Sequence, residues 1–494
     1  MRPLRLLAVA CLAVACLAVA CLAVACLAVA GLAVVPAALA AQGRAPTRPF
    51  GTMKEQDATQ QEWLAKRLDT FLPVLMRKYK VDMWVIPMRE YNEDPVFGAI
   101  TSASTFAARR RTIYLFYDRC TAGGLEPSPS CDKGIERLAF GGSSQGGVFK
   151  AVASMKAVNA AVGSRQAELW GDEQWQVLKS AILERNPRTI AINTSRVFAF
   201  TDGLSSGELA GMSDALGDPW TKRFRPSEGL ALEMISSRLP EEAAYYRKHQ
   251  ELVWSLISRM FSNEVITPGK TKTSELVWWW RQQVADLGIG TWFQPSITIQ
   301  RKGTTSEKLG ADPVIIAGDV LHCDVGITAL RLNTDTQHDA YVLKDGETEA
   351  PAGLTAALRT SNRLQDILME ETRPGRSGNE ILASVRARMT AEKIDGTIYT
   401  HPIGLHGHGA GPLIGLWDYQ DGVPGRGDAL VTANMWFSSE LQATSPVPEW
   451  GGQPVRMMQE EDFVIGADGR PQWALKRQSE LWLVKPKGAA KPKA

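Results

Sequence analysis

The 494-residue sequence predicts an α+β protein with two kinds of structural unit. Between residues 59 and 230, helical and strand-like segments alternate, as in an α/β domain with a parallel or mixed sheet. The order then changes at Pro240, which suits the first turn of a helix. Beyond it, two helices followed by strands occur twice. We therefore expect an N-terminal α/β domain over 59–238 and a second domain over 239–486.

The N-terminal domain is expected to begin with a helix over 59–81, where leucines and aromatic residues keep helical spacing. The apolar runs MWVIPM (83–88) and TIYLFYD (112–118) are strand candidates. A second helix is predicted over 172–185, and the strand segment TIAINTS (189–195) follows it.

The C-terminal domain is expected to contain two pairs of helices. The first pair begins at Pro240 and at Thr273, whose hydroxyl can cap the second helix. The second pair begins near Leu354 and after Ser377, which has capping-box spacing to Glu380. The strand segments SITIQ and VLHCDVGI separate the two pairs.

Residues 1–40 have the pattern of a secretory signal peptide. Arg2 and Arg5 precede an apolar run that repeats CLAVA, and an A-x-A site occupies 38–40. We expect an exported, periplasmic or secreted protein. The alternative is a retained membrane anchor, because an apolar run of this length can span a bilayer. Residues 41–58 are polar and are expected to form a mobile N-terminal arm.

Charge excludes one class of partner. Arg2 and Arg5 account for the formal net charge of +2, so the chain from residue 41 onward is neutral. Without a basic patch, no nucleic acid partner is expected, and no stable membrane partner is expected either. Residues 487–494 are assigned to a short tail.

Three cysteines lie beyond residue 40. In an exported protein, Cys120 and Cys131 could close a small disulfide loop, and two reduced thiols are the alternative. Cys323 lies in a strand-like apolar segment, which favours a place in the core over a role as a ligand.

Acidic and imidazole side chains in the last third of the chain indicate a dinuclear metal site. The candidate ligands are Asp324, Asp335, His401, Glu440 and Glu460. Mixed oxygen and nitrogen ligands favour Mn, Co, Fe or Zn. Two such ions can activate a shared water and stabilise the oxyanion that forms on a carbonyl. Hydrolysis of an amide is therefore the predicted chemistry.

Each part of this pattern also has an ordinary structural interpretation. A hairpin would bring Asp324 and Asp335 together, but aspartates also occur singly in turns. His401, His406 and His408 lie within eight residues, which is typical of metal or acid–base sites but also of a polar loop.

The order and spacing of these residues resemble the pita-bread metallopeptidase family, which includes methionine aminopeptidase, prolidase and aminopeptidase P. The family's metal-binding histidine opens an H-x-x-G motif and a second histidine follows seven residues later, matching His401 and His408. The resemblance is strongest over 240–486, and 60–230 is similar to the family's creatinase-like N-terminal domain. It implies a pita-bread catalytic domain, two divalent ions (Mn first, Zn or Co as alternatives), peptide substrates and a homodimer.

The sequence departs from the family pattern in three places. The family has a further histidine upstream of the first aspartate, and here Gln300, Arg301 or Lys302 is considered as its replacement. Glu460 and Glu461 are adjacent, and period-two alternation on a strand favours Glu460 as the last ligand. The segment after His408 is longer than in aminopeptidase P, and it contains Trp417 and Tyr419. These two aromatic residues either line a substrate pocket or pack within the loop.

The resemblance implies removal of the N-terminal residue from peptides with proline second. Glu440 is expected to be the general base, and His408 is expected to donate a hydrogen bond to the oxyanion. A prolidase-type dipeptidase and a metal-dependent lyase on the same fold are the alternatives. A binding protein is less compatible with the sequence, because none of the five ligands is lost.

Overall fold

The computed structural model describes residues 48–126, 128, 130–152 and 171–486. The expected signal peptide and tail lie outside the described residues. Within the described part of the chain, no helix has the length and apolar character needed to cross a membrane. From Phe50 onward the chain forms one compact unit. The predicted boundary at residues 238–239 lies inside it and stays a prediction.

Helix α2 (Met53–Lys78) begins earlier than the sequence analysis predicted. Thr52 and Glu55 form a capping box in which Glu55 N donates to Thr52 Oγ1 and Thr52 N donates to Glu55 Oε2. This exchange satisfies amide groups that a helix start otherwise leaves unpaired. Residues 53–58 are therefore helical, and the assignment of the whole of 41–58 to a mobile arm was wrong for this part.

A mixed six-stranded sheet forms the centre of the N-terminal half. Its strands are, in spatial order, β4 (Lys150–Val152), β3 (Ile135–Phe140), β2 (Arg111–Asp118), β1 (Met83–Arg89), β5 (Ile190–Ile192) and β6 (Phe224–Pro226). The strands β1–β2 and β2–β3 pair antiparallel, whereas β3–β4, β1–β5 and β5–β6 pair parallel. The prediction of a parallel or mixed sheet is confirmed as a mixed one.

Helices cover both faces of this sheet, which explains why β1 is an unbroken apolar run. Trp84 and Ile86 pack in one core with α2, α3 (Phe97–Ile100) and α6 (Glu228–Ser236). Met83 and Val85 pack in the other, with α4 (Asp172–Arg185) and α5 (Ser206–Leu216). Helix α4 has the bounds that the sequence predicted.

The cysteines follow the expected division of roles. Cys120 and Cys131 are joined by a disulfide, which decides between the two alternatives. Cys323 is a buried free thiol in the core beneath α7 and α8.

Two helix pairs occur in the C-terminal half, as predicted. The first pair is α7 (Pro240–Met260) and α8 (Thr273–Asp286). Thr273 is the first helical residue of α8 rather than its cap. Asp312, from a distant segment, accepts a hydrogen bond from Ser274 N at 3.0 Å and so supplies the capping oxygen. The second pair is α10 (Ala352–Glu371) and α11 (Gly378–Glu392), whose predicted capping box at Ser377 is present.

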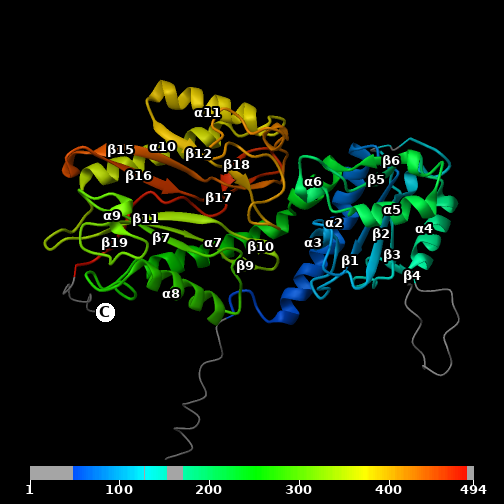
Figure 1. Cartoon of the computed structure of the whole chain (residues 1–494), viewed down its shortest axis with the longest axis horizontal. Helices are drawn as coiled ribbons and strands as arrows, with labels where there is room; N and C mark the ends of the chain where they lie inside the picture. The colour runs from blue at the N-terminus through cyan, green and yellow to red at the C-terminus, as the bar shows by residue number, and fades with distance from the viewer. Residues whose placement is uncertain (1–47, 127, 129, 153–170, 487–494) are drawn as a thin grey trace, which may run out of the picture. The chain divides into compact units, whose positions relative to one another are not determined.

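Three larger sheets lie between these helix pairs (Figure 1). The first contains β19 (Trp482–Val484), β11 (Thr336–Val342), β8 (Val320–Val325) and β7 (Ser296–Gln300). The second contains β12 (Asp395–Ile398), β15 (Leu441–Val447) and β16 (Gln453–Gln459). The third contains β13 (His401–Pro402), β14 (Trp436–Ser438), β17 (Asp462–Ile465) and β18 (Pro471–Trp473). The short pair β9 (Thr328–Ala329) and β10 (Leu332–Asn333) and the helix α9 (Ser306–Leu309) complete this half.

Alternation along β8 assigns its side chains to two environments. Leu321, Cys323 and Val325 join the apolar core with residues of α7 and α8. His322 and Asp324 therefore point from the opposite face of the strand, away from these helices. That face carries the polar residues described next.

Candidate metal centre

The two aspartates come from neighbouring antiparallel strands. Asp324 lies near the end of β8, and its cross-strand partner is Gln337 on β11. Asp335 lies one residue before β11, after the β9–β10 excursion. Asp462 Oδ2 accepts a hydrogen bond from Asp335 N at 3.3 Å and fixes the backbone there. The hairpin expected from the sequence is thus present, with a small two-stranded insertion at its turn.

His401 opens β13 and is fully buried. Its Nδ1 lies 3.0 Å from the carbonyl oxygen of Pro402, which can only accept a hydrogen bond. Nδ1 therefore carries the proton, and the lone pair of Nε2 faces the carboxylates. This is the tautomer that a metal-binding imidazole needs.

Glu440 and Glu460 lie where the chain passes between two sheets. Glu440 stands between β14 and β15, and Glu460 stands between β16 and β17. Backbone hydrogen bonds of 3.1 Å in both directions between Glu460 and Gln337 bind this junction to β11. Both glutamates are buried. The rigid strands on either side thus hold the two carboxylates in place.

These side chains form three overlapping groups in which the ligand atoms lie within 4.8 Å of one another. The groups are Asp324–Asp335–Glu460, His401–Glu440–Glu460 and Asp335–His401–His408. Asp335, His401 and Glu460 each belong to two groups, so the three groups form one continuous cluster. The structure thus brings together all five residues predicted as ligands.

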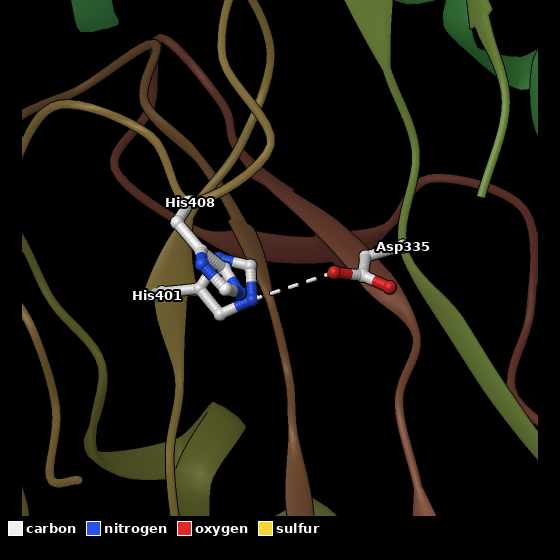
Figure 2. A group of neighbouring side chains, drawn as sticks. All are labelled: Asp335, His401 and His408. Carbon is white, nitrogen blue, oxygen red and sulfur yellow. Dashed lines mark ion pairs between the residues drawn. The ribbon is translucent and has the colours of Figure 1, made fainter. Parts of the chain in front are cut away.

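His401 stands at the middle of the site. Its Nε2 lies 3.2 Å from Glu460 Oε1, 3.7 Å from Asp335 Oδ2 and 3.8 Å from Glu440 Oε2. In Figure 2 the rings of His401 and His408 overlap, and the carboxylate of Asp335 faces His401 across the site. The ring centroids of the two histidines are 4.7 Å apart.

The electrostatics of the cluster favour bound cations. Burial raises the pKa of Asp324 to about 8, and the charge of Glu460 contributes. Burial raises the pKa values of Asp335 and Glu440 well above the usual range, and the charges of neighbouring carboxylates add to this effect. Asp324 Oδ1 and Asp335 Oδ1 are buried without a hydrogen-bond partner among the described residues. Divalent cations would relieve the repulsion and satisfy these oxygens, so the residues fit a metal centre.

Glu461 points away from this cluster. Its Oε1 lies 2.7 Å from His338 Nε2 and accepts a hydrogen bond from Gln478 N at 2.8 Å. It belongs to none of the three groups. The alternation that favoured Glu460 over Glu461 therefore describes the geometry correctly.

Aromatic rings surround His408 on the open side of the site. The Trp292 ring lies 5.1 Å from His408 edge to face, and the Tyr399 ring lies 5.7 Å from it. Trp417 lies 5.8 Å from Tyr399, also edge to face. Trp417 thus packs against an aromatic residue of the site, whereas Tyr419 has no ring contact among the described residues.

None of the three residues considered for the missing upstream histidine faces the cluster. Gln300 exchanges hydrogen bonds with the backbone of Arg456. Arg301 forms a bidentate ion pair with Asp319 at 2.7 and 2.8 Å. Lys302 donates to the carbonyl oxygen of Glu449. The hypothesis that one of them replaces the histidine was wrong, because local partners hold each side chain elsewhere.

Four residues of the site were missed by the sequence analysis: Trp292, Gln337, Tyr399 and Arg426. Period-two alternation from Asp335 predicts that Gln337 shares its face, and this signal was available. Trp292 lies in an irregular segment and Arg426 begins a single 3-10 turn, where spacing carries no such information. A Cβ at Gly407 would lie 2.3 Å from the Trp292 ring, so this glycine makes room for the tryptophan.

The family comparison agrees with this geometry. Residues 244–466 match the model of metallopeptidase family M24. The chain contains an M24 metallopeptidase domain. The matched range includes all five candidate ligands and His408.

Solved structures resemble most of the chain and not only the M24 domain. X-Pro aminopeptidase of Thermotoga maritima is 17% identical with a TM-score of 0.53, and the match covers 82% of this chain and 97% of that one. Xaa-Pro dipeptidase of Bacillus anthracis is 15% identical with a TM-score of 0.51, covering 86% and 99%. The N-terminal domain of FACT complex subunit SPT16 from chickpea is 12% identical with a TM-score of 0.52, covering 85% and 98%.

At these identities the likeness establishes the pita-bread fold and nothing finer. Curated proteins gave no sequence match to the chain. The M24 domain and its carboxylate–histidine cluster therefore carry the functional argument.

Proposed function

We propose that this M24 peptidase removes the N-terminal residue from peptides with proline in second place. The observation that carries the proposal is the convergence of Asp324, Asp335, His401, Glu440 and Glu460, of which all but the half-buried Asp324 are buried, beside aromatic rings. Such a donor set suits metal-assisted hydrolysis better than it suits a purely structural core, where four carboxylates in contact would be costly.

The five residues would hold two divalent cations. Oxygen donors with a single imidazole favour Mn, with Zn and Co as alternatives. When bound, the cations would supply Lewis acidity that lowers the pKa of a water and polarises the scissile carbonyl.

Two side chains have positions suited to the reaction, one to accept a proton and one to stabilise the oxyanion. Glu440 lies at the edge of the cluster and would accept the proton of the attacking water. Burial lowers the pKa of His408 to about 4. His408 is therefore neutral at pH 7 and keeps one N–H, which would donate a hydrogen bond to the developing oxyanion.

The aromatic rings of the site support a substrate with a compact apolar group next to the scissile bond. Trp292 and Tyr399 lie beside His408, and Trp417 packs against Tyr399. Aromatic rings and aliphatic rings bury apolar surface well against one another. A pyrrolidine ring would fit this surface.

A second candidate, cleavage of Xaa-Pro dipeptides, is favoured by Arg426. This residue lies on the short 3-10 helix η5 (Arg426–Asp428), and its charge acts on both His408 and Tyr399. Within the described chain it has no acidic partner, and its hydrogen bond is to the carbonyl of Gly409. A half-buried guanidinium without a counter-charge could bind the free carboxylate of a dipeptide.

Peptide length separates the two candidates. The chain from residue 41 would be incubated with Xaa-Pro dipeptides, longer peptides led by Xaa-Pro and proline-free controls, with Mn or with chelator, and analysed by mass spectrometry. Metal-dependent loss of one residue from the longer peptides supports the aminopeptidase. Cleavage of dipeptides alone supports the dipeptidase. No cleavage by protein with two bound ions contradicts both and favours a lyase.

We further propose that the enzyme is exported and dimeric. The apolar segment over 1–40 and the disulfide between Cys120 and Cys131 support an oxidising location. The homodimer rests on the family resemblance. Cell fractionation with N-terminal sequencing tests export, and sedimentation of the mature protein tests the dimer.

A further inference from the structure

Gln337 lies between two of the candidate ligands. Its Nε2 is 2.9 Å from Glu440 Oε1 and 2.7 Å from Glu460 Oε2. One side-chain amide therefore contacts both glutamates that come from the sheet junctions. Because Gln337 is the cross-strand partner of Asp324, this amide extends from the strand pair that also positions the aspartates.

The direction of every hydrogen bond in this network can be deduced. In the ionised form that binds cations, carboxylate oxygens only accept, so the group of Gln337 that faces them must be the NH₂, and it uses both protons there. The carbonyl oxygen of Gln337 then faces His322, whose Nε2 lies 2.9 Å away. Since that oxygen only accepts, His322 Nε2 must carry the proton.

The same reasoning extends one step further from the cluster. With the proton on Nε2, a neutral His322 has its lone pair on Nδ1. Thr298 Oγ1 lies 3.2 Å from Nδ1 and donates to it. The network thus runs from Thr298 through His322 and Gln337 to Glu440 and Glu460, and each member has a single role.

Burial makes this network difficult to rearrange. His322 and Gln337 are 5% and 4% exposed. A flipped Gln337 amide would place its carbonyl oxygen against two carboxylates and its NH₂ against the N–H of His322. Such unpaired buried groups are costly, so the arrangement holds Glu440 Oε1 and Glu460 Oε2 in fixed positions.

We propose that Gln337 and His322 are positioning residues that orient Glu440 and Glu460 for metal binding. One oxygen of each glutamate is held by the amide, which leaves Glu440 Oε2 and Glu460 Oε1, the atoms nearest His401, to face the cations. The inference rests on the proposed metal site but is independent of which peptide is cleaved. Partners of this kind change metal affinity by about 10- to 100-fold when they are removed.

The test measures metal binding without substrate. Mn²⁺ affinity would be determined by titration calorimetry, and the visible spectrum of the Co²⁺-loaded protein would report ligand geometry. The variants are Gln337→Leu, which keeps the size but removes the amide, and His322→Phe. Gln365→Leu is the matched control, because Gln365 is a fully buried glutamine on α10 without a hydrogen-bond partner among the described residues.

We expect about 10- to 100-fold weaker Mn²⁺ binding and a shifted Co²⁺ spectrum in Gln337→Leu, with wild-type behaviour in Gln365→Leu. His322→Phe should weaken binding in the wild-type background and have no further effect in Gln337→Leu. If Gln337→Leu does not fold, Gln337→Met, which keeps the side-chain length and flexibility, is measured instead.

Two results would overturn the inference. One is a folded Gln337 variant with wild-type affinity and spectrum. The other is a loss of Mn²⁺ affinity in the double variant that equals the sum, in free energy, of the losses in His322→Phe and Gln337→Leu. Failure of the proposed function would give a different result. The wild-type protein would then cleave no peptide, whereas the Mn²⁺ titrations would still show whether Gln337→Leu weakens metal binding.

Discussion

The imidazole Nε2 of His401 lies 3.2 Å from Glu460 Oε1, and both side chains are withdrawn from solvent. The Nδ1 proton of His401 is committed to the carbonyl of Pro402. Two electron pairs therefore face each other across this gap, an arrangement that is unfavourable without a proton or a cation between them. A divalent cation would turn both atoms into ligands.

Replacing His401 by alanine should remove metal and activity together. The buried imidazole that faces the carboxylates is lost. We expect the metal content, measured by elemental mass spectrometry, to fall below two ions per chain. Peptidase activity should fall by more than roughly 100-fold, which is the usual upper effect of losing a residue that only hydrogen-bonds to a metal ligand.

His406 provides a control histidine in the same loop. Its ring packs against Phe200 and is not part of the metal cluster. His406→Ala should keep both ions. Full activity in His401→Ala, or metal loss in both variants alike, would refute the site assignment.

His408→Ala should separate turnover from metal binding. His408 lies on the open side of the site, so its proposed role is toward substrate. We expect two bound ions, a KM near the wild-type value and a kcat lower by about 10²- to 10³-fold, the usual cost of losing an oxyanion donor. Loss of an ion in this variant would instead identify His408 as a ligand.

The metal-free protein should become less stable as pH rises. The pKa of Asp324 is raised from 3.8 when unconstrained to about 8 in the fold, so the folded protein binds protons more tightly than the unfolded chain. A raised pKa gives stability at low pH that is lost as pH rises toward the folded value. Thermal melts in chelator should therefore show a falling Tm between about pH 5 and pH 8.

Mn²⁺ should oppose this loss, so that the stabilisation by metal grows with pH. Asp324→Asn, which cannot ionise, should show a shallower fall in chelator than the wild-type protein. A Tm in chelator that stays level or rises over this range would contradict the raised pKa values of the cluster.

Trp417→Ala should weaken substrate binding more than Tyr419→Ala. Both aromatic residues belong to one loop and have similar exposure, at 42% and 48%. Trp417 contacts Tyr399, which contacts both histidines of the site. We expect KM to rise about 3- to 10-fold in Trp417→Ala, the size of one lost aromatic contact. Equal effects in the two variants would argue for loop packing alone.

Regular elements were well predicted because their signals are local. The apolar run of β1, the capping box at Ser377 and proline at the start of α7 each follow from a few neighbouring residues. The start of α2 was missed although Thr52 and Glu55 have the same capping-box spacing. The cap of α8 could not be predicted, since Asp312 reaches it from a distant segment.

The ligand set was predictable for a different reason. Its order along the chain resembles a known family, and strand alternation distinguishes Glu460 from Glu461. The aromatic rings of the site depend on tertiary contacts instead. Trp292 reaches His408 from an irregular segment, and Gln300, Arg301 and Lys302 are held away by partners that no local pattern specifies.

Anomalous diffraction from crystals of the Mn²⁺-loaded protein would show whether the five residues bind two cations. We expect two anomalous peaks per chain, both among Asp324, Asp335, His401, Glu440 and Glu460, and their disappearance after chelation. Peaks elsewhere, or an ordered cluster without any peak at saturating Mn²⁺, would contradict the proposed metal site.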